Sequence, residues 1–216
     1  MKSSWDIKLS PWVIADGNYG DFVRGQRAEF ALEFWSEALT NSPRCERVCV
    51  MNGDSYDVTA EVIASLEDAW VIDFGLRAYR DEAPMLASRA GDFVSGSLSI
   101  GVDPFFYFER LCERTEIPPL VYSWEIASIT MVTTPLVPVR AGLLRRRWIP
   151  DESKRQEQEV EGTDCPSPPD FTYVQEGKGL RPSHNLWFRL RCELLDVPPK
   201  RNSMTAKWHS NRSTTR

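Results

Sequence analysis

Histidine is nearly absent from this sequence, which contains only His184 and His209 among 216 residues. Nucleophilic mechanisms that use histidine as the base would depend on one of these two. His184 stands just before a predicted strand, where we expect a turn histidine without a catalytic duty, and His209 falls in the predicted tail. Histidine-based catalysis is therefore not predicted.

Cysteines are few and form no dense framework. The five stand at positions 45, 49, 112, 165 and 192. An odd number at these spacings predicts reduced thiols in a cytoplasmic protein rather than disulfides in a secreted one. Cys45 and Cys49 lack a second pair of similar spacing, so we predict no metal site.

Long apolar runs are also lacking, since none approaches the roughly 18 residues of a membrane-spanning helix. The segment Met1 to Asp6 has no apolar stretch like that of a signal peptide. We therefore predict no membrane partner. Phosphate-binding glycine loops, dinucleotide fingerprints, His-Glu-x-x-His and Gly-x-Ser-x-Gly are missing too, and we predict no cofactor.

Carboxylates remain as candidates for catalysis. Five aspartates lie in or beside predicted strand-end turns, namely Asp16, Asp21, Asp73, Asp92 and Asp103. They could converge as acid, base or metal ligands, but aspartate in such turns more often binds backbone amides. We expect the structural role, and keep a small-ligand-binding barrel or a carboxylate-based enzyme as a further alternative.

Charge is unevenly distributed behind the net value of −5. Residues 1–139 carry 11 Lys/Arg against 21 Asp/Glu, whereas residues 140–216 carry 15 against 10. An acidic body repels phosphate backbones and favours basic partners. Nucleic acid remains possible only for the basic C-terminal part.

Alternating apolar residues and recurrent turns predict an all-β fold, an antiparallel barrel or sandwich. The clearest strand is 91–102, where Val94, Leu98 and Ile100 alternate with serines. An Asn52-Gly53 turn predicts a hairpin between 47–51 and 56–63. Asp103-Pro104 followed by apolar residues at helical spacing predicts one short helix near 104–114.

Residues 1–196 are expected to form a single β-rich domain. Within it, the polar stretch 150–170 is predicted to be an exposed loop, because it has too little apolar surface to order by itself. Residues 197–216 are predicted to be a disordered basic tail.

A short self-similarity suggests internal duplication. Trp12-Val13-Ile14 followed by Gly20-Asp21-Phe22-Val23 is echoed by Trp70-Val71-Ile72 followed by Gly91-Asp92-Phe93-Val94. Gly91-Asp92-x-Val94-x-Gly96 resembles the strand opening of OB-type barrels of the S1 kind, where glycine lets a coiled strand bend. The resemblance implies an OB-like barrel.

The leading functional hypothesis is a non-catalytic cytoplasmic binding module for a protein partner, of adaptor or immunity type. The alternative is an OB-like binder of single-stranded nucleic acid. Candidate binding residues combine basic and aromatic side chains: Arg145, Arg146, Arg147, Trp148, Trp187, Arg189 and Arg191. An exposed patch among Trp5, Trp35, Trp148 and Trp187 would mark an interface.

Overall fold

The computed structural model describes residues 3–43, 45–84, 87–140, 146–165, 171–176, 179–195 and 199–200. The chain divides into two compact units. The first comprises Met1–Ile7, Arg27–Glu125 and Glu193–Arg216, and the second comprises Lys8–Gln26 and Ile126–Cys192. The boundaries fall within three strands, β1 (Ser4–Leu9), β10 (Tyr122–Arg140) and β15 (His184–Leu194).

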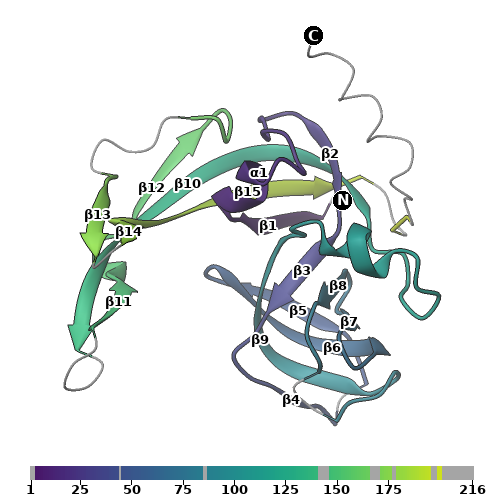
Figure 1. Ribbon diagram of the computed structural model, residues 1–216. Coiled ribbons are helices and arrows are strands. Elements are labelled where there is room, and N and C mark those ends of the chain that lie inside the picture. Colours follow the sequence, from purple (N-terminus) through teal and green to yellow (C-terminus); the bar gives the residue numbers. More distant parts are fainter. Residues whose placement is uncertain are drawn as a thin grey trace. The chain divides into compact units, whose positions relative to one another are not determined.

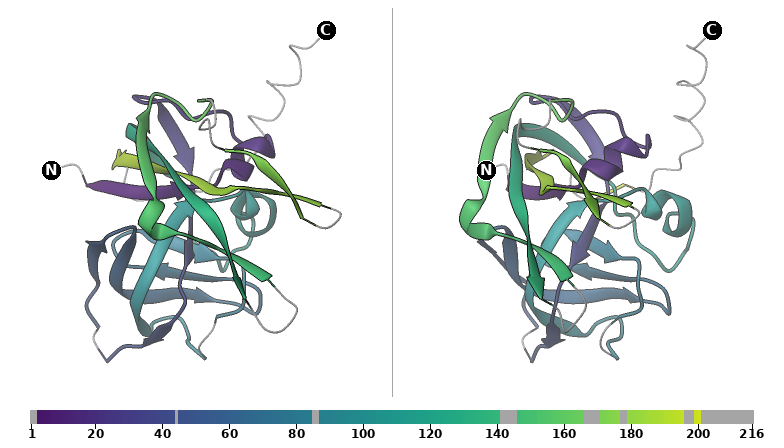
Figure 2. Two further views of the ribbon diagram at one scale, coloured as in Figure 1. Left: turned by 90° about the vertical axis from the view of Figure 1, so that its left-hand side faces the viewer. Right: turned by 60° about the vertical axis from the view of Figure 1, so that its left-hand side comes forward.

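The first unit is built on a closed five-stranded barrel (Figures 1 and 2). Its elements are β2 (Arg27–Phe30), β3 (Leu32–Trp35), β4 (Leu39–Asn41), β5 (Val48–Asn52), β6 (Ser55–Ser65), β7 (Trp70–Asp73), β8 (Arg77–Arg80), β9 (Phe93–Val102) and the π-helix η1 (Tyr107–Leu111). Strands β9, β3, β8, β7 and β6 pair in that order, and a β6–β9 ladder closes the ring. All of these pairs are antiparallel except β3–β8.

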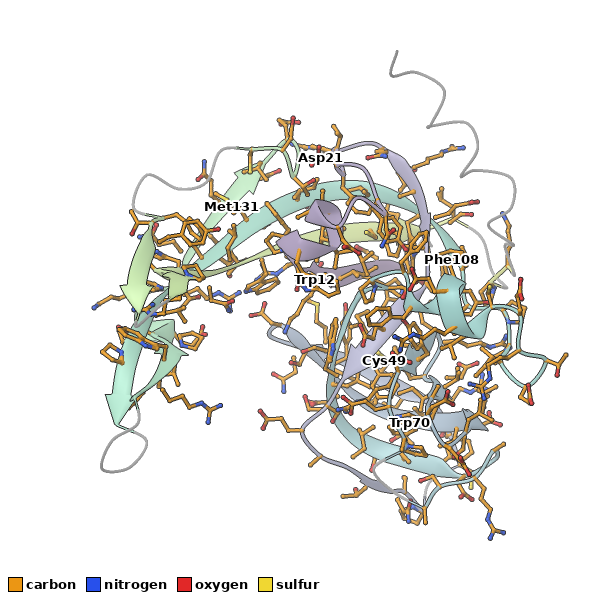
Figure 3. All side chains as sticks on the ribbon, viewed as in Figure 1. Trp12, Asp21, Cys49, Trp70, Phe108 and Met131 are labelled. Atoms are coloured by element: carbon orange, nitrogen blue, oxygen red, sulfur yellow. The ribbon has the colours of Figure 1, made fainter. Side chains whose placement is uncertain are left out.

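Strand alternation explains the barrel interior. Val94, Leu98 and Ile100 of β9 are buried, as predicted, and the serines between them lie on the outer face. The Phe34 ring packs edge-on against Trp70, with 5.1 Å between ring centroids. Trp70 is fully buried and lies among the side chains that fill the barrel (Figure 3).

A second apolar cluster covers part of the barrel's outside. Tyr107 and Leu111 of η1 share a buried cluster with Val71 and Tyr79, which lie on barrel strands. The helix predicted near 104–114 is thus confirmed, and it shields one face of β7 and β8 from water.

The second unit consists mainly of strands paired to β10. It contains α1 (Pro11–Ala15), β11 (Arg146–Pro150), the 3-10 helix η2 (Glu152–Lys154), β12 (Gln156–Val160), β13 (Tyr173–Glu176) and β14 (Gly179–Pro182). β11 and β12 pair with successive stretches of β10, and β15 pairs with β10 as well. β13 and β14 form a separate hairpin.

The all-β prediction is confirmed, but the two echoed segments have different structures. Trp12-Val13-Ile14 lies in the helix α1, whereas Trp70-Val71-Ile72 lies in strand β7. Pro11 occupies the first turn of α1, where its fixed φ favours a helix and its missing N–H costs nothing. The echo therefore does not mark two equivalent structural repeats.

The polar stretch 150–170 is more regular than the predicted loop. Its residues Gln156 to Glu159 are exposed, yet they pair with β10 as part of β12. Of the predicted tail, only Pro199 and Lys200 lie within the described residues. No helix in the described ranges is long and apolar enough to cross a membrane.

Candidate functional site

Trp187 and Arg189, two of the predicted binding residues, belong to one cluster on the second unit. Three cationic groups lie around the Trp187 ring: Lys8 Nζ at 5.3 Å from the ring centroid, Arg155 Cζ at 5.5 Å and Arg189 Cζ at 5.7 Å. The Arg189 guanidinium also donates two hydrogen bonds, of 2.9 and 3.0 Å, to the Glu157 carboxylate. This ion pair holds the pKa of Glu157 below its usual range. Within this cluster the Glu157 carboxylate is thus already paired with Arg189, and the Trp187 ring already has cations around it.

Trp148 forms a second, separate contact. The Arg181 guanidinium carbon stands 3.2 Å from the centroid of the Trp148 ring. Trp148 pairs with Pro138 of β10, whereas Glu157 pairs with Val132, so the two contacts lie about 20 Å apart along that strand. A nucleic-acid base stacking on this face of Trp148 would have to displace the guanidinium.

The remaining predicted binding residues are Arg145, Arg146, Arg147 and Arg191. Arg147 and Arg191 are exposed on β11 and β15. Arg146 begins β11, pairing with Arg140. Arg145 lies outside the described residues.

Of the first four candidate aspartates, Asp73 and Asp92 bind nearby backbone amides, as expected of turn residues, whereas Asp16 and Asp21 bind side chains. Asp16 accepts from Asn18 Nδ2 (2.9 Å), Asp21 from Thr163 Oγ1 (3.1 Å), Asp73 from the Gly75 amide (3.0 Å) and Asp92 from the Arg89 amide (2.7 Å). In the described part of the chain, no group of three or more His, Cys, Asp or Glu side chains is arranged to hold a metal ion.

Asp103 differs from the other four because it is fully buried. Its Oδ1 accepts a short hydrogen bond from the Tyr79 hydroxyl and one of 3.2 Å from the Tyr107 amide at the start of η1. Its Oδ2 is buried and has no hydrogen-bond partner among the described residues. Burial raises the pKa of Asp103 to about 7, although these hydrogen bonds act in the opposite direction.

Glu33 is electrostatically coupled to Asp103. Burial, and next the charge of Asp103, raise the pKa of Glu33 to about 7. Two residues after Asp103, Phe105 adopts a φ of 85°, a left-handed conformation that is strained for a phenylalanine. The Asp103 carboxyl is closed off from solvent. We therefore expect its ionisation to affect the stability of the fold rather than a substrate.

Part of the outer face of the barrel is exposed, at Ser97 of β9 and Asp57 of β6, whereas Thr59 on the same face is buried. Ser95, Ser97 and Ser99 of β9 lie on this face. Ser95 pairs with Thr59 of β6, and Ser97 pairs with Asp57. Ser99 pairs with Trp35 of β3, whose side chain is 40% exposed. Trp35 is thus the member of the four candidate tryptophans that the structure exposes most clearly.

The edge strand β5 borders the same face. Val50 pairs with Asp57, and Val48 pairs with Thr59. Val48, Val50 and Met51 are all exposed, Val50 to 58% and Met51 to 52%. Among the described residues β5 pairs with no strand other than β6, so its second edge is open.

Sequence reasoning identified the hairpin and the serine alternation that build this face, but not its exposure. Exposure depends on which neighbours cover a strand, and η1 covers β8 while leaving β9 and β5 open. Comparison with protein-family models, curated proteins and solved structures finds no match.

Proposed function

We propose that this protein is a non-catalytic binding module that takes up an extended segment of a partner protein along the open edge of β5. The partner strand would continue the sheet through main-chain hydrogen bonds, with apolar side chains beside Val48 and Val50. The observation that carries the proposal is this open edge with its exposed apolar side chains.

The β5 edge has none of the usual protection against strand pairing. From Val48 to Asn52 there is no proline and no charged residue, and its register with β6 is unbroken. Natural sheets normally blunt such edges with charges, proline or bulges. An unprotected, apolar edge is therefore suited to receive another strand.

Charge indicates what the partner should look like. Residues 27–125, which form most of the first unit, contain 8 Lys/Arg against 18 Asp/Glu. Asp57 stands exposed beside Val50 on the neighbouring strand. A strand that alternates apolar and basic residues complements this surface, whereas a second copy of the chain would bring like charges together.

The reactive side chains support a binding role over catalysis. Burial raises the pKa of the Cys49 thiol to about 11, which keeps it protonated and unreactive near neutral pH. His184 is buried and its Nδ1 lies 2.7 Å from the Ser183 hydroxyl. None of the five cysteines is in a disulfide, which suits the reducing cytoplasm that we propose as its location.

Replacing Val50 by lysine should weaken binding of a synthetic peptide that alternates valine with arginine and lysine. The added charge repels the basic strand and removes an apolar contact, so we expect the Kd to rise about tenfold. Fluorescence anisotropy of the labelled peptide measures the affinity. Hydrogen exchange should show new protection of β5 amides in the complex.

The matched control is Val139→Lys, because Val139 is an exposed valine on β10 and should leave the Kd unchanged. Equal losses in both variants, or binding without protection of β5, would contradict strand addition. Self-association through β5 in sedimentation experiments, abolished by Val50→Lys, would assign the edge to a second copy and also overturn the proposal.

A further inference from the structure

A depression on the outer face of the first unit lies beside the exposed ring of Trp35. It has a volume of about 530 Å³ and is lined by Trp35, Ser36, Glu37, Ala38, Ser55, Ser97, Leu98 and Ser99. The walls come from the end of β3, the following turn, the start of β6 and the middle of β9. Three segments distant in sequence thus form one site.

The walls of this depression are held in place by the fold. The Ser36 hydroxyl donates a 2.7 Å hydrogen bond to the Ser97 carbonyl, which fastens the turn after β3 onto β9. Ser55 and Ser99 hydroxyl oxygens lie 3.3 Å apart and share a hydrogen bond across β6 and β9. A ligand would therefore meet a site that is largely formed in advance.

The lining combines three kinds of group. Trp35 offers a flat aromatic surface, Glu37 an exposed carboxylate, and Ser55, Ser97 and Ser99 hydroxyl oxygens that can accept hydrogen bonds. None of the eight lining residues is cationic. The nearby Arg80 guanidinium is not part of the lining; it donates to the Ser36 carbonyl at 3.3 Å and pairs with Glu82. Glu37 is therefore the one charged side chain in the lining.

We infer that this depression is a binding site for a guanidinium group, supplied by an arginine side chain of a partner protein. A guanidinium stacks on tryptophan and presents five N–H donors in a plane, which suits the carboxylate and hydroxyl acceptors of the lining. Lysine carries its charge as a compact point and lacks the planar face. The site lies on β3, β6 and β9 and does not require strand pairing at β5.

The probe is N-acetyl-arginine methylamide, titrated into the ¹⁵N-labelled full chain by NMR, with the neutral citrulline analogue in parallel. The Trp35 indole N–H signal, assigned by its loss in Trp35→Phe, should shift saturably with arginine and not with citrulline. Glu37→Gln should weaken binding about two- to fivefold, as loss of an exposed ion pair does.

The matched control is Trp12→Ala, which removes another exposed tryptophan, on α1, and should leave the titration unchanged. Equal shifts with arginine and citrulline, or arginine shifts confined to residues outside the depression, would overturn the inference. Its failure is separable from that of strand addition: Val50→Lys should not alter arginine binding, and Glu37→Gln should not alter protection of β5.

Discussion

The free energy of unfolding should fall as the pH rises from 5 to 8, and Asp103→Asn should flatten this dependence. Burial raises the pKa of Asp103, and likewise that of Glu33, to about 7, whereas both carboxyls titrate near pH 4 in an unfolded chain. Between these values the folded state holds more protons than the unfolded state. Stability is then greatest below the unfolded pKa and is lost as the pH rises through the folded pKa.

The size of this effect follows from the shift at Asp103. One pKa unit corresponds to about 1.4 kcal/mol, and allowing for structural relaxation around the charge we expect a loss on the order of 2 kcal/mol over the window. Urea unfolding at pH 5, 6, 7 and 8 measures it. Hydrogen bonds from Arg114, Ser153 and Arg189 lower the pKa of Asp68, Asp151 and Glu157 respectively. These interactions affect stability only at more acidic pH.

Asp103→Asn should cost about 1 to 3 kcal/mol at pH 5, because it places buried amide donors at a position where Oδ2 has no hydrogen-bond partner among the described residues. The cost should shrink at pH 8, where the wild type must bury a charge and the variant does not. Glu33→Gln should flatten the curve in the same direction if Asp103→Asn fails to fold. Asp57→Asn, at an exposed position, serves as the control and should run parallel to the wild type.

A wild-type curve that is level or rises between pH 5 and 8 would contradict this account. So would an Asp103→Asn curve as steep as that of the wild type. The first result would mean that Asp103 is charged at neutral pH and is stabilised by its bonds to Tyr79 and the η1 backbone more than burial penalises it. The second would mean that another group, such as Glu33, causes the pH dependence.

Local pattern was enough to predict some of the strands that build the barrel, but not β8. The alternation in β9 distinguished its buried residues from its serines, and Asn52-Gly53 located the hairpin, in which Gly53 has a φ of 61°. A short helix was predicted near 104–114, and η1 lies within that range, although its N-cap is Phe106 and not Asp103. Each of these features depends on residues close together in the sequence.

Packing decided what the sequence pattern left open. Trp12-Val13-Ile14 is as apolar as Trp70-Val71-Ile72, but the preceding Pro11 favours a helix and only the second segment lies in a closed sheet. The bond between Tyr79 and Asp103 joins residues 24 positions apart, and the Trp35 depression joins three segments. Contacts between residues this far apart cannot be recognised in a single sequence. For this reason Trp187, and not Glu37, was chosen as a candidate binding residue.

Gly96→Ala should destabilise the protein by about 2 to 4 kcal/mol. A Cβ atom at this position would stand 2.6 Å from the Ala38 carbonyl oxygen and 3.0 Å from Leu39 Cδ2. The first neighbour is backbone, which cannot rotate away, and Gly96 also has a φ of 155°. The glycine thus allows the turn after β3 to approach β9 closely enough for the Ser36–Ser97 bond.

Gly20→Ala is the matched control, because no atom lies within 4 Å of a Cβ built there, and it should change the free energy of unfolding by less than about 0.5 kcal/mol. Urea denaturation followed by tryptophan fluorescence measures both. If Gly96→Ala folds at low temperature, it should also bind arginine more weakly than Gly20→Ala, since the turn carrying Glu37 must move away from β9. If Gly96→Ala had the same free energy of unfolding as the wild type, the turn after β3 could move away from β9 without loss of stability. The reason for expecting a preformed depression beside Trp35 would then be removed.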